Sequence, residues 1–139
     1  MASAIGIDYG DSRIGIAVSD PMGIVATPRC VISGKEGLDK VCRSIGEIYV
    51  SERCSAVVVG YPLNMDGTGG ERVRRTELFI KRFSEIFPEA KIVRWDERLT
   101  TKAADRAMLA MGVKQKQKGV SDMIAAQMIL QSYLESVRS

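Results

Sequence analysis

The chain has 139 residues, of which 45% are hydrophobic and 27% are charged, a composition that fits one folded domain with a substantial core. It contains no histidine, which excludes Ser-His-Asp and Cys-His catalysis and the usual histidine-bearing zinc and iron sites. The net charge of +3 permits nucleic-acid binding without arguing for it, and 6% aromatic residues are too few for a platform of stacked bases. Any enzyme activity must therefore use carboxylates, lysine, hydroxyls or a metal held by oxygen.

No apolar run approaches the ~20 residues of a membrane span, and the N-terminus lacks the basic-then-apolar pattern of a signal peptide. We expect one cytoplasmic domain over residues 1–139. Its three cysteines, Cys30, Cys42 and Cys54, are widely spaced and form no CxxC motif. They are predicted to be small core residues, not parts of a disulfide framework or a zinc site.

Hydrophobic periodicity predicts a mixed α/β sheet with helices on both faces. In chain order, the expected elements are strands over 4–9, 13–19 and 26–32, a helix over 37–52, a strand over 55–60, a helix over 71–87, a strand over 91–97, and helices over about 100–111 and 121–137. Gly10-Asp11-Ser12 predicts a hairpin between the first two strands, and Pro28 favours a sheet edge for the third.

An aspartate interrupts the first strand. Ile5 and Ile7 point to one face, whereas Gly6 and Asp8 point to the other. Because an unpartnered buried carboxylate is costly, we expect Asp8 to have partners elsewhere in the chain. Gly6 and Gly10 are expected to clear space on its side for metal ions and a phosphate.

A second acid begins the last helix. With Ser121 as N-cap, Asp122 lies in the first turn and heads an apolar stripe that continues through Ala125, Ala126, Ile129 and Tyr133. The helix dipole alone favours an acid in the first turn by roughly 0.3–1 kcal/mol, but it does not explain an acid on the inward face. A structural and a functional interpretation of Asp122 both stay open.

A third acidic position follows the strand KIVRWDE, where Asp96 and Glu97 stand at the carboxyl end. Ligands bind at such ends in open α/β sheets, although an ordinary polar strand end would look the same. Together, Asp8, Glu97 and Asp122 would form an all-oxygen site suited to Mg²⁺ or Mn²⁺. Two such ions can hold the attacking and leaving oxygens of a phosphodiester in line.

Basic residues form two clusters, Arg72-Val73-Arg74-Arg75 and the KQKQK run at 114–118. The second lies just before Asp122, where a phosphate backbone would need neutralising, although a charge run is usually a solvated face. The predicted nucleic-acid contacts are Arg13, Arg98, Lys114, Lys116 and Lys118. The glycine-rich loop YPLNMDGTGG matches neither GxxxxGK[ST] nor GxGxxG, so it is either a backbone-positioning loop or a connection.

Four motifs in order, GIDYGDSRIGIAVSD, VVVGYPLNMDG, DERLTT and KGVSDMIAAQMIL, cover nearly the whole chain. With these motifs the chain resembles the YqgF (RuvX) family of Holliday-junction resolvases and ribosomal RNA maturation nucleases. The resemblance implies a ribonuclease-H-like fold with strand order 3-2-1-4-5, catalytic acids at Asp8, Glu97 and Asp122, and dependence on Mg²⁺ or Mn²⁺. It also implies a bacterial cytoplasmic nuclease that acts on branched DNA or on the 5′ end of the 16S rRNA precursor.

In that strand order the Asp8 and Glu97 strands are separated by the SAVVVG strand, so they lie roughly 10 Å apart. The intervening strand ends at Gly60, which has no side chain to block the gap.

Two alternative functions remain: a phosphate- or ATP-binding module of the actin/hexokinase type, and a non-catalytic nucleic-acid-binding protein. A junction resolvase would be expected to act as a homodimer, whereas an RNA-processing nuclease could act as a monomer.

Overall fold

The structure is a computed structural model that describes residues 2–64, 66–99 and 118–138, the last from residue 121 with its side chains. Its elements are β1 (Ser3–Tyr9), β2 (Arg13–Ser19), β3 (Ala26–Ser33), α1 (Leu38–Ser51), β4 (Cys54–Tyr61), α2 (Glu71–Ile86), β5 (Lys91–Asp96), the 3₁₀ turn η1 (Glu97–Leu99) and α4 (Lys118–Arg138). The helix expected over 100–111 lies outside the described residues. No helix among those described is long and apolar enough to cross a membrane.

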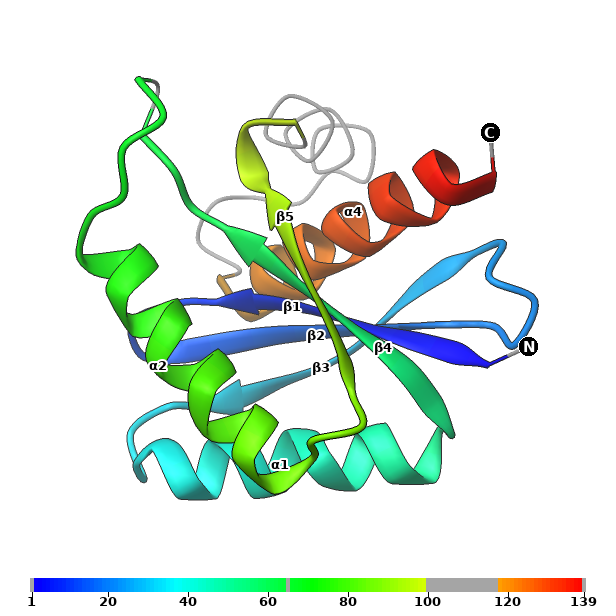
Figure 1. The fold of residues 1–139 in the computed structure, drawn as a ribbon, viewed down its shortest axis with the longest axis horizontal. Helices are drawn as coiled ribbons and strands as arrows, with labels where there is room; N and C mark the ends of the chain where they lie inside the picture. Colours follow the sequence, from blue (N-terminus) through cyan, green and yellow to red (C-terminus); the bar gives the residue numbers. More distant parts are fainter. Residues whose placement is uncertain (1, 65, 100–117, 139) are drawn as a thin grey trace.

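The five strands form one mixed sheet in the order β3-β2-β1-β4-β5, as predicted. β1 pairs antiparallel with β2 and parallel with β4, and β5 extends the parallel side beyond β4. Pro28 lies in the edge strand β3, where a missing N–H costs least. Helices α1 and α2 cover one face of the sheet and α4 covers the other (Figure 1).

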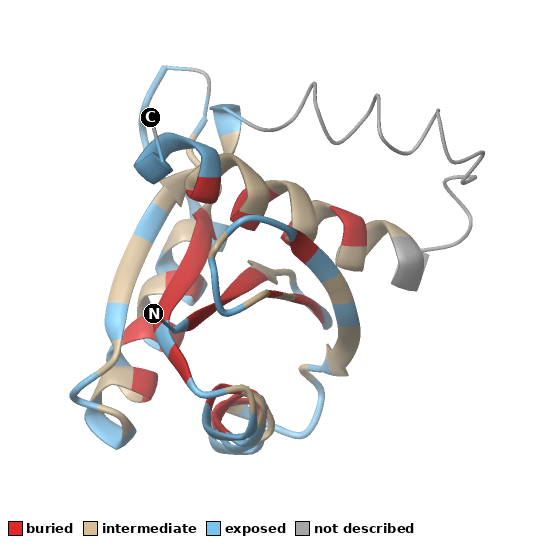
Figure 2. Cartoon of the chain, turned by 90° about the vertical axis from the view of Figure 1, so that its right-hand side faces the viewer, coloured by how far each residue is buried: buried red, intermediate tan, exposed pale blue. Residues whose placement is uncertain are grey.

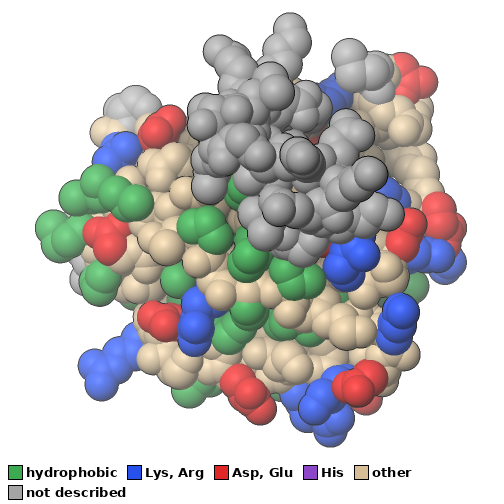
Figure 3. Space-filling model, turned by 180° about the vertical axis from the view of Figure 1, so that it is seen from behind, with side chains coloured by type: hydrophobic (Ala, Val, Ile, Leu, Met, Phe, Trp, Pro, Cys, Tyr) green, Lys and Arg blue, Asp and Glu red, His purple; other side chains and the backbone are tan. Residues whose placement is uncertain are grey.

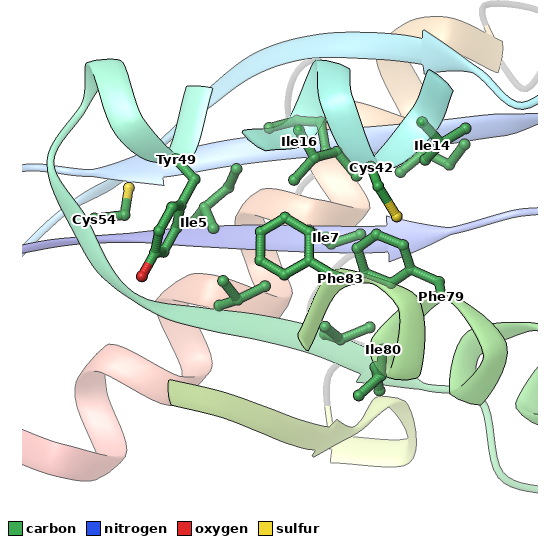
Figure 4. Close-up of a cluster of buried hydrophobic side chains, with 14 residues drawn as sticks. Ile5, Ile7, Ile14, Ile16, Cys42, Tyr49, Cys54, Phe79, Ile80 and Phe83 are labelled. Carbon is green, nitrogen blue, oxygen red and sulfur yellow. The ribbon is translucent and has the colours of Figure 1, made fainter. Parts of the chain in front are cut away.

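The larger core lies between the sheet and the α1–α2 layer. Ile5 and Ile7 of β1 are fully buried there, facing the aromatic rings of α2, Phe79 and Phe83 (Figure 4). Cys42 and Cys54 are buried in the same cluster and Cys30 packs against it, and all three cysteines are free thiols, as expected. Buried residues line the central strands and the inward sides of the helices (Figure 2). This core fixes the ends of β1 and α2 relative to each other.

The opposite face is built from small residues, which lets α4 lie directly on the strands. A Cβ atom on Gly6 would stand 2.7 Å from Cβ of Leu130 and 2.9 Å from the carbonyl oxygen of Ala126. The space beside Gly6 is therefore filled by α4 and not by a site for ions, which corrects the expectation from the sequence. The turn backbone fills the space at Gly10 in the same way, because a Cβ there would stand 2.5 Å from the carbonyl oxygen of Arg13.

The last helix starts three residues before the expected N-cap. α4 begins at Lys118, so Ser121 is inside the helix and Asp122 is in its second turn. Ala126 and Ile129 are buried against the sheet, as the predicted stripe requires, whereas Ala125 and Tyr133 are only partly buried. Since Asp122 is beyond the first turn, dipole compensation explains its position less well than the sequence suggested.

Candidate active site

Two of the predicted acids meet at the end of the sheet. Asp8 is the penultimate residue of β1, and Glu97 follows β5 directly as the first residue of η1. Their carboxyl groups are hydrogen-bonded to each other across the intervening strand β4. The Asp8 side chain is 14% exposed, so the pair is largely withdrawn from water.

Gly60 makes this meeting possible. A Cβ atom on Gly60 would stand 3.0 Å from Cγ and 3.1 Å from Cδ of Glu97, and 2.5 Å from Cδ1 of Ile129. The Glu97 side chain thus crosses β4 over the one backbone position that offers no side chain against it. The predicted geometric role of Gly60 is confirmed.

Burial and mutual repulsion favour a shared proton. Burial raises the pKa of Asp8, while the positive charge of Arg72 acts in the opposite direction. Burial, followed by the negative charge of Asp8, raises the pKa of Glu97 from 4.5 to about 7. Without a metal ion, burial and the proximity of the two carboxyl groups therefore favour one proton held between Asp8 and Glu97.

Asp122 approaches the same strand end from α4. Gly15 of β2 is the cross-strand partner of Asp8, and a Cβ atom on Gly15 would stand only 1.9 Å from the carbonyl oxygen of Asp122. The negative charge of Asp122 contributes to the raised pKa of Asp8, which places all three acids within one electrostatic neighbourhood. In the part of the chain that the structure describes, however, no three acidic, cysteine or histidine side chains form a group that could hold a metal ion.

Arginines hold the acids in this arrangement. Nε of Arg13 lies 2.8 Å from Oδ2 of Asp122, and Nη2 of Arg72 lies 3.5 Å from Oδ1 of Asp8. Arg72 also donates a hydrogen bond to the carbonyl oxygen of Tyr9, at 3.4 Å. The sequence placed Arg13 among the nucleic-acid contacts but did not place Arg72 at the acids. The only sequence signal for Arg72 was its position behind the glycine-rich loop, in the first turn of α2.

The other residues predicted to contact nucleic acid are Arg98, Lys114, Lys116 and Lys118. Arg98 pairs with Asp96 through Nη2 and Oδ2 at 2.7 Å, beside Glu97. Lys114 and Lys116 lie outside the described residues, and of Lys118 only its place at the start of α4 is known. On the face seen in Figure 3, the described Lys and Arg side chains alternate with Asp and Glu side chains and do not gather into one continuous basic patch.

The loop between β4 and α2 folds on itself. The backbone N–H of Asn64 donates to the carbonyl oxygen of Thr68 at 2.8 Å, and Asp66 accepts hydrogen bonds from the Thr68 backbone and hydroxyl. Behind the loop, Glu77 of α2 accepts a hydrogen bond from the Tyr61 hydroxyl and pairs with Arg94 of β5. These contacts tie α2 to β4 and β5, and so they fix the helix that carries Arg72.

Comparison with known families agrees with this geometry. The family model described as RuvX, Holliday junction resolvase, matches residues 2–136. The chain belongs to the RuvX family. It is 47% identical over 134 residues to a protein of Ruminiclostridium cellulolyticum named "Putative pre-16S rRNA nuclease", covering 96% of this chain and 94% of the relative. A protein of the same name from Flavobacterium johnsoniae is 38% identical, with 99% of each chain covered.

Solved structures support the ribonuclease-H-like fold that the sequence predicted. Thermus thermophilus RuvC in complex with a Holliday junction substrate has a TM-score of 0.64 at 13% identity, covering 100% of this chain and 97% of that one. The yeast mitochondrial Holliday junction resolvase Ydc2 has a TM-score of 0.51 at 11% identity, covering 99% and 82%. At these identities the likeness concerns the fold alone.

Proposed function

We propose that the chain is a nuclease that hydrolyses phosphodiester bonds with Mg²⁺ or Mn²⁺, and that Asp8, Glu97 and Asp122 are its catalytic acids. The observation that carries the proposal is the contact between Asp8 and Glu97 across Gly60. Folding has brought two acids together from strands that are not neighbours, although desolvation makes this contact costly. Such an arrangement is more consistent with a functional site than with a stabilising one.

The donor chemistry of the three acids fits a hard divalent cation. Carboxylate oxygens are the ligands that Mg²⁺ and Mn²⁺ prefer. Burial, more than any other cause, raises the pKa of Asp8 and of Glu97, and a bound cation would offset the cost of keeping both carboxylates ionised there. When bound, divalent ions supply stabilisation of the negative charge that develops on the attacking and leaving oxygens of a phosphodiester. Asp8 and Glu97 would both bind the ion. Asp122 would become the third ligand once its carboxylate separates from Arg13.

The arginines have a second role in this proposal. In the structure, Arg13 neutralises the charge of Asp122 and Arg72 that of Asp8. A divalent ion would neutralise the same two carboxylates in place of the arginines. Both side chains are nearly half exposed, so they are free to turn to phosphate oxygens. Arg98, Lys114, Lys116 and Lys118 are the further phosphate contacts that we propose.

The substrate that we propose first is the 16S rRNA precursor, at its 5′ end. Two relatives named "Putative pre-16S rRNA nuclease" are 38% and 47% identical over nearly the full chain, which supports precursor rRNA as the substrate class. The family description also names Holliday junctions, so resolution of branched DNA is the second candidate. Cleavage of a symmetric junction would require a homodimer, whereas an rRNA-processing nuclease could act as a monomer.

The test offers purified protein a precursor rRNA fragment and a synthetic four-way junction side by side, with Mn²⁺ or Mg²⁺. We expect metal-dependent cleavage of one substrate, and loss of cleavage in Asp8→Asn without loss of folding. Asp96→Asn is the matched control, because Asp96 is a neighbouring acid that pairs with Arg98 and not with Asp8. Equal cleavage by the wild type and Asp8→Asn, or binding of nucleic acid without cleavage by the folded wild type, would overturn the proposal.

A further inference from the structure

A recess of about 300 Å³ opens beside the acids, on the other side of β1. It is lined by Tyr9, Asp11, Leu38, Arg75 and Leu78. These residues come from the end of β1, the hairpin that follows it, the first residue of α1 and the second and third turns of α2. None of them is one of the proposed catalytic acids, and neither the proposed chemistry nor the family comparison gives the recess a role.

The recess combines apolar walls with a polar rim. Leu38 and Tyr9 pack against the core, and the Tyr9 ring stacks on Phe79 with ring centroids 5.0 Å apart, so the ring is held in place. Leu78 is an apolar residue of α2 that is 47% exposed, so its side chain forms part of the recess wall and is not part of the core. At the rim, Nη1 of Arg75 lies 2.8 Å from Oδ1 of Asp11.

The position of the recess relative to the acids is fixed by the strand. Successive side chains of β1 alternate between faces, so Asp8 points toward α4 and Tyr9 toward α1 and α2. The recess therefore lies one residue away from a proposed catalytic acid, around the end of the same strand. Arg72 bridges the two, because its guanidinium contacts both Asp8 and the carbonyl oxygen of Tyr9.

We propose that this recess binds one unpaired base of the substrate strand, next to the phosphodiester bond that is cut. This inference rests on the proposed nuclease function and adds a specificity subsite to it. A nucleobase has flat apolar faces and an edge of hydrogen-bond donors and acceptors, which match the walls and the Asp11–Arg75 rim. Arg72 and Arg75 lie three residues apart on one side of α2, where they reach the phosphates on either side of that base.

The proposal has a consequence for substrate choice. A base that is stacked and paired in a duplex cannot enter the recess, whereas an unpaired base can. We therefore expect a strand with an unpaired base beside the cut to bind more tightly than the same strand in a continuous duplex.

The test uses the Glu97→Gln protein with Mg²⁺, so that binding is measured without cleavage. The probes are short single-stranded oligoribonucleotides that carry one 2-aminopurine at successive positions. We expect the fluorescence to change at one position, and Leu78→Glu to weaken binding about tenfold, which is the scale of losing one stacked base. Ile86→Glu is the matched control, since Ile86 is an exposed apolar residue at the far end of the same helix. It should leave binding within about twofold of the parent.

Leu78 is exposed, so Leu78→Glu should fold normally, and a second pair of variants tests the ring. Tyr9→Phe should retain the fluorescence change, whereas Tyr9→Leu should lose it. Equal weakening of binding by Leu78→Glu and Ile86→Glu, together with cleavage of nucleic acid by the wild type, would exclude the recess and leave the nuclease function intact. If the parent binds no oligonucleotide and the wild type cleaves none, the proposed function and the subsite fail together.

Discussion

A single methyl group added at Gly60 of β4 should disturb both the packing of α4 and the position of Glu97. In Gly60→Ala the new Cβ would stand 2.5 Å from Cδ1 of Ile129 and 3.0–3.1 Å from the Glu97 side chain. Ordinary carbon–carbon contact begins at about 3.5 Å, so Ile129 must retreat by about 1 Å and Glu97 by a few tenths of an ångström. Overpacking of this kind costs about 1–3 kcal/mol of unfolding free energy. Displacing a catalytic group by up to 1 Å costs as much as 100-fold in rate, so we expect cleavage to fall about tenfold or more.

Two further variants separate stability from activity. Gly60→Ala/Ile129→Val removes the crowded Cδ1 atom, so its unfolding free energy should return toward that of Ile129→Val alone, whereas cleavage should stay low because Glu97 remains displaced. Gly70→Ala is the control for a harmless methyl, since a Cβ there meets nothing within 4 Å. Thermal unfolding and metal-dependent cleavage are measured on the same samples. A Gly60→Ala protein that is destabilised but cleaves at the wild-type rate would refute the role of the Glu97–Gly60 contact.

Two other predictions follow from the same site. The unfolded chain releases the Glu97 proton near pH 4.5, whereas burial raises the pKa of Glu97 in the folded protein to about 7. The unfolding free energy of the metal-free protein should therefore fall as pH rises from 4.5 to about 7, and Glu97 contributes about 3 kcal/mol to that fall. Urea unfolding should show a smaller fall in Glu97→Gln than in the wild type, because only Asp8, whose pKa burial also raises, is left in the variant; parallel curves would contradict this. In Gly15→Ala the methyl meets backbone of Asp122, which cannot give way without moving α4, so Tm should drop by roughly 10 °C. A Tm unchanged from the wild type would mean that α4 does not lie on β2 as described.

Local patterns in the sequence were sufficient for the strands and helices of the described residues, and the family resemblance supplied the order of the strands. The alternation of Ile5 and Ile7 with Gly6 and Asp8 predicted β1 and its two faces correctly. Gly60 was identifiable because the strand order, combined with strand spacing, left one position between the two acids. The faces of β1 follow from short-range periodicity, whereas the position of Gly60 between the acids follows from the strand order that the resemblance implies, together with regular strand spacing.

The features that were missed depend on long-range packing. Ser121 has the residue type of an N-cap, but a cap contributes only about 1 kcal/mol, and α4 already runs from Lys118. Gly6 was assigned to an ion site because its neighbour across the space, α4, is more than a hundred residues away. The Arg13–Asp122 and Arg72–Asp8 pairs likewise join distant segments, and no local pattern distinguishes these arginines from others on the surface.

The central claim is that acids from β1, η1 and α4 form one metal site, and Mn²⁺ binding tests it most directly. Calorimetric titration at pH 8 would compare the wild type with Asp8→Asn, Glu97→Gln, Asp122→Asn and the control Asp96→Asn, with folding checked by thermal unfolding. We expect each of the first three variants to weaken Mn²⁺ binding by about tenfold or more, and Asp96→Asn to bind as the wild type does. Undiminished Mn²⁺ binding by the three variants would contradict the account.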